Sequence, residues 1–582
     1  MADHQYPAFR DHYGIYPLGE LASRAAEKFG KLTALQWWSG QGYEGITYNE
    51  LSSRVDAVAR WLIETGIKPD DRVAIYAENS PEWGIVYLAI QRAGAVGVPI
   101  DRSLPTSGVV NILRHSETRL LFSQKNYLTG LDEEPDTPDL LARISFDTCD
   151  MEDMFDFNQI QKEGEGLTCS FPERNLEDKA VIIYTSGTTG HSKGVVLNQR
   201  NISSNVAASA QLTDCGPGDG ILVLLPMSHA LQCTNGFLHP LYIGMTLTFA
   251  RRLRSAEIIA DIREAKITLM GSVPIMYEKM HQKMIAEVRK KNILVRFLFQ
   301  LMMGLAAIGA TLRLPLGRIL FSGIRKRGGL GSIRYFITGG AAIDPKTSRF
   351  FKLLGIPMMQ GYGLTETSPV THFSPPWSRR PECVGLPVPG VHARIADPGP
   401  DGVGEICIKG PNVFTGYHKD PTATSAVIDN EGWFYTGDLG IIHRDGYLQI
   451  TGRKKNVIVT GGGKNVYPEE VEHHLNRCSY IAESLVMGIP RGVTSGEEVA
   501  ALVLPDHESL TEHFGNEDTI PKDKDLLRFI REEAQDFLRD MPEYARVRTY
   551  GLVSEPFEKT TTMKIKRYIY SGRFNDLAMT IL

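Results

Sequence analysis

Hydrophobic and polar positions along the first third of the chain follow the rhythm of an α/β protein. Apolar residues recur at helical spacing over residues 48–65 and 81–93. Each of these segments is followed by a short apolar run typical of a buried strand, at 72–77 and 96–100. Helices that alternate with strands in this way predict a parallel sheet covered by helices. The expected fold class is therefore α/β.

The clearest strand–helix–strand unit lies further along the chain. A strand over 333–338 runs into a glycine pair, and Asp344-Pro345 supplies a cap and first turn for a helix that ends at Gly355. A second strand follows at 356–360. Ligands of open α/β sheets bind beyond the carboxyl ends of parallel strands. The segments after the two strands, 339–341 and 361–366, are therefore predicted to face one pocket.

The pattern changes near residue 390. Short strands separated by Gly, Pro and Asp turns predict a β-rich subdomain up to 452. Beyond it, a helix opened by Pro468, strands at 484–488 and 499–504, and a charged helix at 524–540 predict a compact α+β domain of about 130 residues. We expect a large N-terminal domain of parallel-sheet α/β subdomains plus the β-rich subdomain, residues 1–452, and a small mobile C-terminal domain, residues 453–582.

Composition excludes several classes of function. A net charge of −5 argues against a general nucleic-acid-binding surface. Seven scattered cysteines without a CxxC pair fit neither a disulfide framework nor a zinc site, so a reducing, cytoplasmic setting is expected. Neither end of the chain carries a readable targeting signal. The longest charge-free stretch, 297–312, is short of the roughly 20 residues of a spanning helix, so none is expected.

The run YTSGTTGHSKGVV at 184–196 has the composition of a phosphate-binding loop. Glycines leave backbone N–H groups unobstructed, hydroxyls add donors, and Lys193 adds a mobile charge. No glycine immediately precedes Lys193, and Gly194 stands where a P-loop has Ser or Thr, so a P-loop NTPase is disfavoured. Strand-like runs flank the loop, and we expect the following helix to be capped by Asn201. The alternative for such a run is a flexible surface turn.

Further motifs follow in a fixed order: ITYNELSSRVDAVARWL near the start, GYGLTETSPV at 361–370, YTGDLG at 435–440, GRKKNVIVTGGGKNVYPEEVE at 452–472 and MKIKR at 563–567. Together they resemble, over nearly the full length, the adenylate-forming superfamily of acyl-CoA synthetases, peptide-synthetase adenylation domains and luciferases. The resemblance implies two steps. A carboxylate attacks the α-phosphorus of ATP and expels pyrophosphate, and a thiol then displaces AMP. ATP, Mg²⁺ and coenzyme A are the implied cofactors.

The resemblance also implies roles around the triphosphate. The loop residues would hold the leaving pyrophosphate: Thr185, Ser186, Gly187, Thr188, Thr189, Gly190 and Lys193. Glu366 would contact Mg²⁺ together with Thr188, and Thr365 would bind the α-phosphate. Further small residues would line the nucleotide site: Gly339, Gly340, Ala341, Gly361 and Gly363. A lone glutamate is more often a solvated loop acid, but its place beside Thr365 at a strand end favours the functional reading.

Other positions match the nucleoside and acyl groups. Tyr362 would stack on adenine, although an aromatic residue there is more often packing. Asp438 would accept from both ribose hydroxyls, with Arg453 reaching the same sugar; the alternative for Asp438 is turn chemistry alone. His229 would gate entry of the acid, and the alternative is a structural histidine.

A mobile C-terminal domain would supply the remaining groups. Lys564 is expected to bridge the carboxylate and α-phosphate in the first step, and Lys566 is a neighbouring alternative. Rotation at the hinge, Lys455, would then bring Gly462 and Gly463 to the thiol channel. A loose turn is the alternative for these glycines.

Residues 280–327 bear on which acid is used. The segment alternates the basic clusters 289–291 and 325–327 with an apolar stretch. It suits either peripheral contact with a membrane or a helical insertion packed on the protein. With TETSPV and TTTMKIKR, it favours a long-chain fatty acid–CoA ligase, with fatty acid, ATP and CoA as partners and no nucleic acid.

Three other readings stay open. The first is transfer to a carrier-protein thiol, or action on a medium-chain or aryl acid. The second is a luciferase-type oxygenase. The third is a non-catalytic lipid-binding relative.

Overall fold

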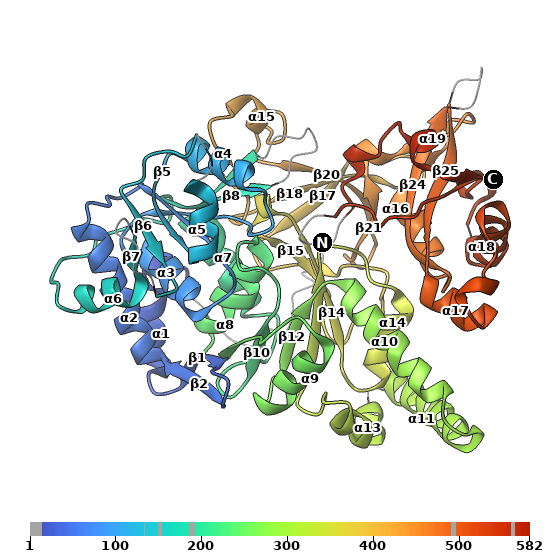
Figure 1. Cartoon of the computed structure of the whole chain (residues 1–582), viewed down its shortest axis with the longest axis horizontal. Helices are drawn as coiled ribbons and strands as arrows, with labels where there is room; N and C mark the ends of the chain where they lie inside the picture. Colours follow the sequence, from blue (N-terminus) through green and yellow to red (C-terminus); the bar gives the residue numbers. More distant parts are fainter. Residues whose placement is uncertain are drawn as a thin grey trace.

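The computed structural model describes residues 14–132, 134, 136–148, 154–185, 193–312, 314–490, 496–539, 541–559 and 565–582. Two large sheets lie side by side in the N-terminal part, and the C-terminal part forms a separate body at one end of the molecule (Figure 1). The mixed α/β class expected from the sequence is confirmed.

The first large sheet has eight strands in the order β19-β9-β8-β4-β3-β5-β6-β7. Its strands are β3 (Arg72–Tyr76), β4 (Val96–Pro99), β5 (Thr118–Ser123), β6 (Ala142–Ser145), β7 (Phe155–Asp156), β8 (Lys179–Thr185), β9 (Lys193–Asn198) and β19 (Gly416–Tyr417). Strands β3 to β8 pair in parallel, as the alternating pattern predicts. The helices between them begin at capped residues: α2 (Tyr48–Glu64) at Thr47 and α3 (Pro81–Arg92) at Ser80.

The exception in this sheet is the β8–β9 pair, which is an antiparallel hairpin around the phosphate-loop sequence. Strands flank the loop on both sides, as expected. Helix α7 (Gln199–Ser209) follows immediately, but its cap is not Asn201. The side chain of Asn198 accepts from the backbone of Asn201, and Asn201 reaches back to Asn198 in a reciprocal capping box. The prediction failed because either asparagine satisfies the cap pattern, and the register is set by how far β9 extends.

The second large sheet has nine strands in the order β16-β15-β14-β13-β12-β10-β11-β1-β2. Its strands are β1 (Thr33–Trp38), β2 (Tyr43–Thr47), β10 (Gly220–Val223), β11 (Thr246–Phe249), β12 (Leu269–Ser272), β13 (Tyr335–Gly339), β14 (Met358–Gly363), β15 (Val370–Phe373) and β16 (Leu386–Pro387). The predicted strand–helix–strand unit is β13–α14–β14. Asp344 caps α14 (Pro345–Leu353), and β13 and β14 pair in parallel.

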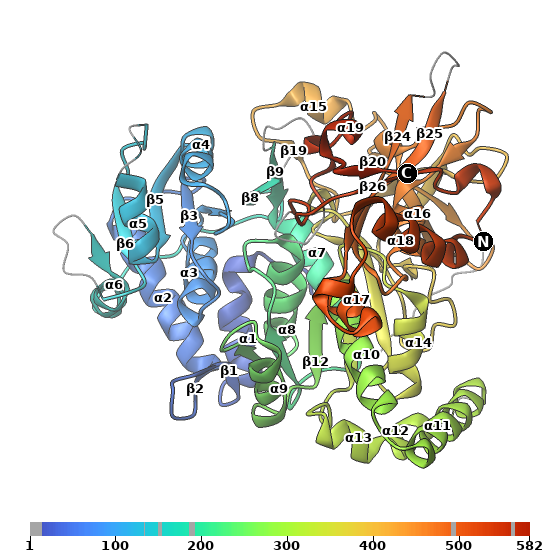
Figure 2. The same cartoon turned by 45° about the vertical axis from the view of Figure 1, so that its right-hand side comes forward.

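Residues 274–327 leave this sheet as four helices: α10 (Pro274–Arg289), α11 (Ile293–Thr311), α12 (Leu316–Leu320) and α13 (Ser322–Arg327). Helix α11 projects at the periphery of the molecule in both views (Figures 1 and 2). The expectation that no helix reaches spanning length needs correction, because α11 is long and apolar enough to cross a membrane by length and composition. The charge-free criterion overlooked it because a single arginine, Arg296, interrupts the apolar run.

The β-rich subdomain forms a four-stranded antiparallel sheet, in the order β17-β18-β20-β21. Its strands are β17 (His392–Ala396), β18 (Gly404–Lys409), β20 (Phe434–Ile442) and β21 (Leu448–Arg453). The C-terminal part has its own hydrophobic core, which begins at Ile458. It contains the hairpin β22 (Ile458–Val459) and β23 (Asn465–Val466), the sheet β24 (Ile481–Pro490), β25 (Glu497–Pro505), β26 (Thr549–Leu552) and β27 (Thr580–Ile581), and helices α16 (Pro468–Leu475), α17 (His507–Phe514) and α18 (Asp523–Leu538). A boundary between 452 and 453 stays a prediction.

Ion pairs anchor both flanks of residues 560–564, which lie outside the described residues. Lys559 pairs with Glu483 on β24, and Arg567 donates to Glu472 on α16. The second guanidinium nitrogen of Arg567 donates to the Val486 carbonyl at 2.8 Å. Arg567 therefore ties the last segment of the chain to both α16 and β24.

We expect Arg567→Met to lower the free energy of unfolding by about 2 kcal/mol, because it leaves a partly buried glutamate without its cation. Urea denaturation followed by circular dichroism measures this loss. Arg573→Met, at an exposed arginine of the same segment, is the matched control and should change stability by less than about 0.5 kcal/mol. Equal losses in the two variants would show that the Arg567 ion pair is not stabilising.

Candidate functional site

The predicted nucleotide segments meet at the carboxyl edge of the nine-stranded sheet. Gly339 at the end of β13 is paired with Gly361 on β14, and Ser272 at the end of β12 is paired with Thr338. Gly340 follows with φ at +84°, a conformation that favours glycine. The structure therefore brings segments 339–341 and 361–363 together, although the second segment forms the end of β14 and does not lie beyond it.

A buried carboxylate lies where this edge meets the four-stranded sheet. Asp438 on β20 is 5 % exposed, and its Oδ1 is 2.8 Å from the Nε of Arg453, its cross-strand partner on β21. Its Oδ2 accepts from the hydroxyl of Tyr362 on β14 at 2.9 Å. Three residues that the sequence predicts around the nucleoside are thus in direct contact. Tyr362 has a hydrogen-bonding task that was not anticipated, and its stacking on adenine stays a prediction.

A second carboxylate lies beyond the end of β14. Glu366 is in a short 3-10 turn, Thr365–Thr367, and its Oε1 accepts from the hydroxyl of Tyr417 at 2.9 Å. Burial raises the pKa of the Glu366 carboxyl, and the Tyr417 hydrogen bond opposes that rise. The Lys193 ammonium lies 4.8 Å from the centre of the Tyr417 ring. Tyr417 therefore links the lysine of the hairpin to the predicted metal contact.

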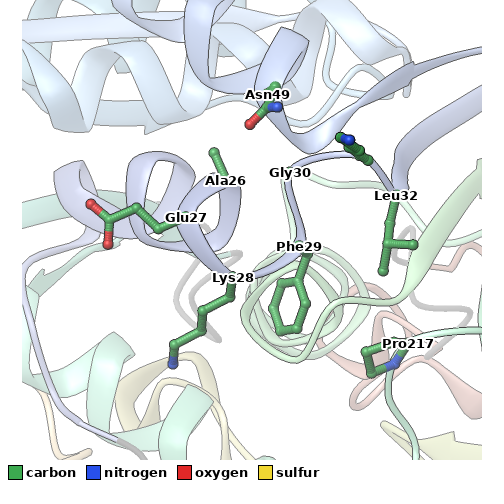
Figure 3. Close-up of a pocket in the computed structure, with 9 residues that line it drawn as sticks. Ala26, Glu27, Lys28, Phe29, Gly30, Leu32, Asn49 and Pro217 are labelled. Atoms are coloured by element: carbon green, nitrogen blue, oxygen red, sulfur yellow. The ribbon is translucent and has the colours of Figure 1, made fainter.

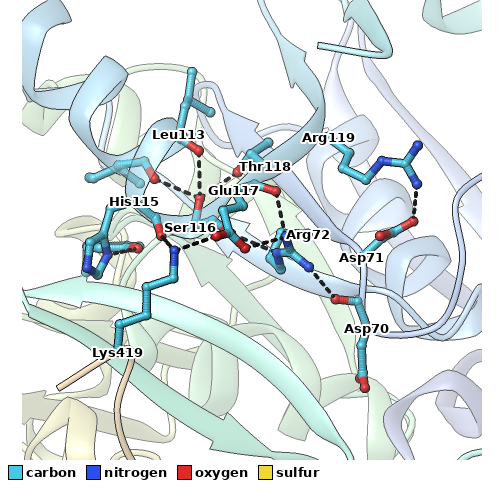
Figure 4. A network of polar contacts seen from close by, with 12 residues as sticks. Asp70, Asp71, Arg72, Leu113, His115, Ser116, Glu117, Thr118, Arg119 and Lys419 are labelled. Carbon is cyan, nitrogen blue, oxygen red and sulfur yellow. Dashed lines mark hydrogen bonds and ion pairs between the residues drawn. The ribbon is translucent and has the colours of Figure 1, made fainter. Parts of the chain in front are cut away.

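A polar network holds the segment that carries Tyr417 (Figure 4). Lys419 donates to Glu117 at 2.8 Å and to the His115 carbonyl at 3.0 Å, both at the end of helix α4 (Thr106–Ser116). Arg72 on β3 pairs with the other oxygen of Glu117 at 3.1 Å. The eight-stranded sheet thereby fixes the position of Tyr417 from its far side.

The remaining predicted residues are spread more widely. His229 lies 3.3 Å from Asp101, which follows β4, so this pair joins the two large sheets. Lys455 lies in an exposed turn directly after β21. Gly462 and Gly463 are exposed in the loop between β22 and β23, with no atom near either Cα substituent position. The structure does not bring these glycines into contact with Asp438 or Glu366.

Several predicted residues lie outside the described residues: Ser186, Gly187, Thr188, Thr189, Gly190 and Lys564. Their flanks are described. Thr185 and Lys193 are paired at the end of the β8–β9 hairpin. Lys566, the alternative to Lys564, pairs with Glu558 at 3.3 Å.

The largest described surface cavity is elsewhere. It measures about 580 Å³ and lies at the turn between α1 (Leu21–Phe29) and β1, with Phe29, Leu32, Asn49 and Pro217 among its walls (Figure 3). This turn and Pro217 precede β1 and β10, so the cavity lies at the amino ends of the parallel strands. Ligands bind at the opposite edge of such sheets, so this cavity is not the nucleotide site.

An α/β sheet edge that carries a clamped carboxylate, beside a lysine-bearing hairpin and a separate C-terminal body, fits a nucleotide-binding enzyme of the adenylate-forming class. The family model described as "AMP-binding enzyme" matches residues 22–418. The chain therefore belongs to this family.

Individual relatives agree with this assignment. The chain is 29% identical to the peroxisomal long chain acyl-CoA synthetase 6 of Arabidopsis thaliana, over 90% of this chain and 80% of the relative. It is 30% identical to a methyl-dioxo-octahydro-indenyl-propanoyl:CoA ligase of Rhodococcus jostii, over 80% of this chain and 85% of the relative. The crystal structure of ATP-bound MatB from Rhodopseudomonas palustris shares the fold, with a TM-score of 0.73, 24% identity, and coverage of 96% of this chain and 99% of that one.

Sequence reasoning missed Tyr417, Lys419 and Asp101. Tyr417 and Lys419 lie in GYHKDP, a segment with the composition of an ordinary turn. Their contacts with Glu366 and Glu117 cross 51 and 302 positions of the chain, so no local spacing signals them.

The glycines of the site are needed for different reasons. A Cβ on Gly363 would lie 1.8 Å from the Pro369 carbonyl oxygen, so that position requires glycine for packing between β14 and the following turn. We expect Gly363→Ala to cost about 3 kcal/mol in the free energy of unfolding, measured by urea denaturation. Gly462→Ala, where the added methyl meets nothing within 4 Å, is the control and should change stability by less than about 0.5 kcal/mol. A stable Gly363→Ala variant that loses only nucleotide affinity would refute the packing explanation.

Proposed function

We propose that the protein activates a long-chain fatty acid with ATP, giving an acyl-adenylate and pyrophosphate, and then transfers the acyl group to coenzyme A with release of AMP. Membership of the AMP-binding enzyme family over most of the chain carries this proposal. The long-chain acid is supported by the printed function of the Arabidopsis relative. The Rhodococcus relative acts on a ring-bearing propanoyl group, which favours a cyclic acid as the second candidate substrate.

The Asp438 clamp is suited to a ribose. Two adjacent hydroxyls need two acceptors at fixed separation, which one carboxylate provides. Arg453 and Tyr362 each engage one carboxylate oxygen from the protein side and so fix the plane of the group. Each oxygen retains a second acceptor position for a ribose hydroxyl. The clamp therefore orients the sugar without any movement of the buried aspartate.

Lys193 and Glu366 are suited to the triphosphate. The Lys193 ammonium would stabilise charge on the leaving pyrophosphate. Glu366 is a partly buried carboxylate whose pKa is raised, so a nearby cation would favour its charged form. One protein carboxylate together with phosphate oxygens and water is the usual coordination of Mg²⁺, so these residues fit the ion. When bound, Mg²⁺ would neutralise part of the triphosphate charge.

The two steps would use different faces of the C-terminal domain. Lys564 would bridge the acid and the α-phosphate in the first step, and rotation about Lys455 would then present Gly462 and Gly463 to the thiol. The exposed loop and the open space around both glycines support close approach of a pantetheine arm. His229, held beside Asp101, would stand at the entry of the acid.

The cell context is part of the proposal. We place the protein in the cytoplasm, in peripheral contact with a membrane through the 280–327 segment. Coenzyme A is the proposed acceptor, and an acyl carrier protein is the alternative acceptor of the same thiol chemistry.

We expect Tyr417→Phe to weaken binding of ATP about ten-fold when Mg²⁺ is present, because Glu366 loses a charge-assisted hydrogen bond. The phenyl ring retains its contact with Lys193, so metal-free ATP should bind nearly as in the wild type. Isothermal titration calorimetry with and without Mg²⁺ measures both affinities. Tyr335→Phe is the control, because it removes a 2.9 Å hydrogen bond to Asp214 at the amino end of β13. An equal loss with and without Mg²⁺ would exclude the positioning role.

A panel of acids tests the reaction and Lys564 together. We expect ATP- and CoA-dependent formation of AMP and acyl-CoA to be fastest with palmitate-length acids, slower with octanoate and cyclic acids, and undetectable with acetate. Lys564→Ala should lower adenylate formation at least a hundred-fold and leave thioester formation from supplied acyl-adenylate within a few-fold, because general stabilisation of the first transition state is lost.

Lys566→Ala is the matched control and should retain most of the adenylation activity. Equal loss of both half-reactions in Lys564→Ala would refute the two-conformation assignment. Absence of AMP formation with every acid would refute the enzyme and leave a lipid-binding relative. Transfer to a carrier protein but not to CoA would select the alternative acceptor.

A further inference from the structure

Helix α11 carries a large exposed apolar face. Only 17% of its most apolar stretch is buried, so it is not the core helix of a soluble domain. Ile293 is 82% exposed and Phe297 is 66% exposed. With Leu294, Leu298, Leu301 and Ile308 they fall within about 140° of arc at 100° per residue. A contiguous patch of this kind marks an interaction site.

The opposite face of α11 is packed against the protein. Phe299, Ala306 and Gly309 are buried, and the Phe299 ring contacts Phe321 at 5.6 Å between centroids. A Cβ on Gly309 would lie 2.8 Å from the Cβ of Leu316, so α12 approaches the helix closely there. The helix is thus held lengthwise along the body of the protein. That arrangement leaves one long side free and prevents the helix from crossing a membrane without unpacking.

The charge around this face is strongly positive. Residues 280–327 contain ten Lys or Arg and one acidic residue, Glu287, in a chain whose net charge is −5. Arg289, Lys290 and Lys291 are exposed directly before the start of α11, and Arg296 is exposed within it. The second cluster contributes less than its sequence suggests, because Arg325 is buried and donates to the carbonyls of Ile333 and Leu330. Only Lys326 and Arg327 of that cluster are exposed.

We propose that α11 lies in the plane of an anionic membrane surface, with its apolar side at the acyl-chain boundary and the basic residues at its start among lipid phosphates. Exposed apolar residues on one side of a helix with lysine and arginine beside them are the features of an interfacial helix. A second protein copy would bring two such basic surfaces together, which the charge opposes. The inference rests on the proposed function, because the acid to be activated dissolves in that membrane.

Helix α10 joins this surface to the candidate site. It starts directly after β12, whose end is paired with β13 beside Gly339. It then packs on α14, where the His281 ring stacks on Phe350 at 4.2 Å between centroids and Glu278 accepts from the Asp344 backbone at 3.1 Å. The membrane surface and the strand edge are therefore opposite ends of one rigid element.

Vesicle sedimentation tests the proposal with the full chain. We expect the wild type to bind phosphatidylcholine vesicles that contain phosphatidylglycerol, and at least ten-fold more weakly vesicles of phosphatidylcholine alone. Phe297→Ser combined with Leu301→Ser should weaken binding to the anionic vesicles ten-fold or more. Lys290→Gln combined with Lys291→Gln should weaken it about five-fold per charge. Leu141→Ser, at an exposed leucine before β6, is the matched control and should bind as the wild type does.

Other results would overturn the proposal. These are absence of vesicle binding by the wild type, an equal loss in Leu141→Ser, or a wild-type dimer in sedimentation velocity that Phe297→Ser with Leu301→Ser makes monomeric. Retention on vesicles after alkaline carbonate extraction would indicate a spanning helix and would also overturn it. Each variant is first shown to keep the wild-type melting temperature. Acyl-CoA formation from detergent-dispersed acid is measured separately, so loss of the proposed reaction is distinguishable from loss of membrane binding.

Discussion

The contact on which the site depends is the clamp around Asp438. Tyr362 reaches it from the nine-stranded sheet and Arg453 from the last strand of the four-stranded sheet. A carboxylate that is 5 % exposed is tolerated only when charged or hydrogen-bonding partners surround it. These partners come from two different sheets, so satisfying Asp438 also fixes how the sheets meet. The same contact holds the strand that leads directly to the exposed turn at Lys455.

Local patterns predicted most of this arrangement. The helices and strands between residues 48 and 100 agree with the structure to within a residue or two, since periodicity and caps such as Ser80 are local signals. The motif resemblance also selected Asp438, Arg453 and Tyr362 before any contact among them was known. What it did not provide was the partner of each group. Tyr417 reaches Glu366 only because β19 pairs with β9 from a distant part of the chain, and a turn-like sequence gives no sign of that pairing.

Residues 280–327 show a different limit of sequence reasoning. The composition predicted a helical, basic and apolar segment, but two readings were open because apolar residues can face either a protein core or a lipid. Packing decides between them. Phe299 faces inward while Phe297, two positions away, is largely exposed, so the same residue type lies on opposite sides of one helix. Arg325 is an equally clear case, because a residue from a basic cluster is buried and satisfies backbone carbonyls instead of facing solvent.

The distance between α11 and the strand edge constrains how an acid reaches the site. Helix α10 has 16 residues and therefore spans about 24 Å. One leaflet of a bilayer offers about 15 Å of hydrocarbon thickness, which is the scale of a lipid acyl chain. If α11 lies at the membrane surface, an acid whose carboxylate has reached the strand edge has withdrawn most of its chain from the bilayer. The chain then needs apolar cover along α10. Met276, Met280 and Met284 are partly buried on that helix against the neighbouring core, and the adaptable shape of methionine suits contact with a flexible chain.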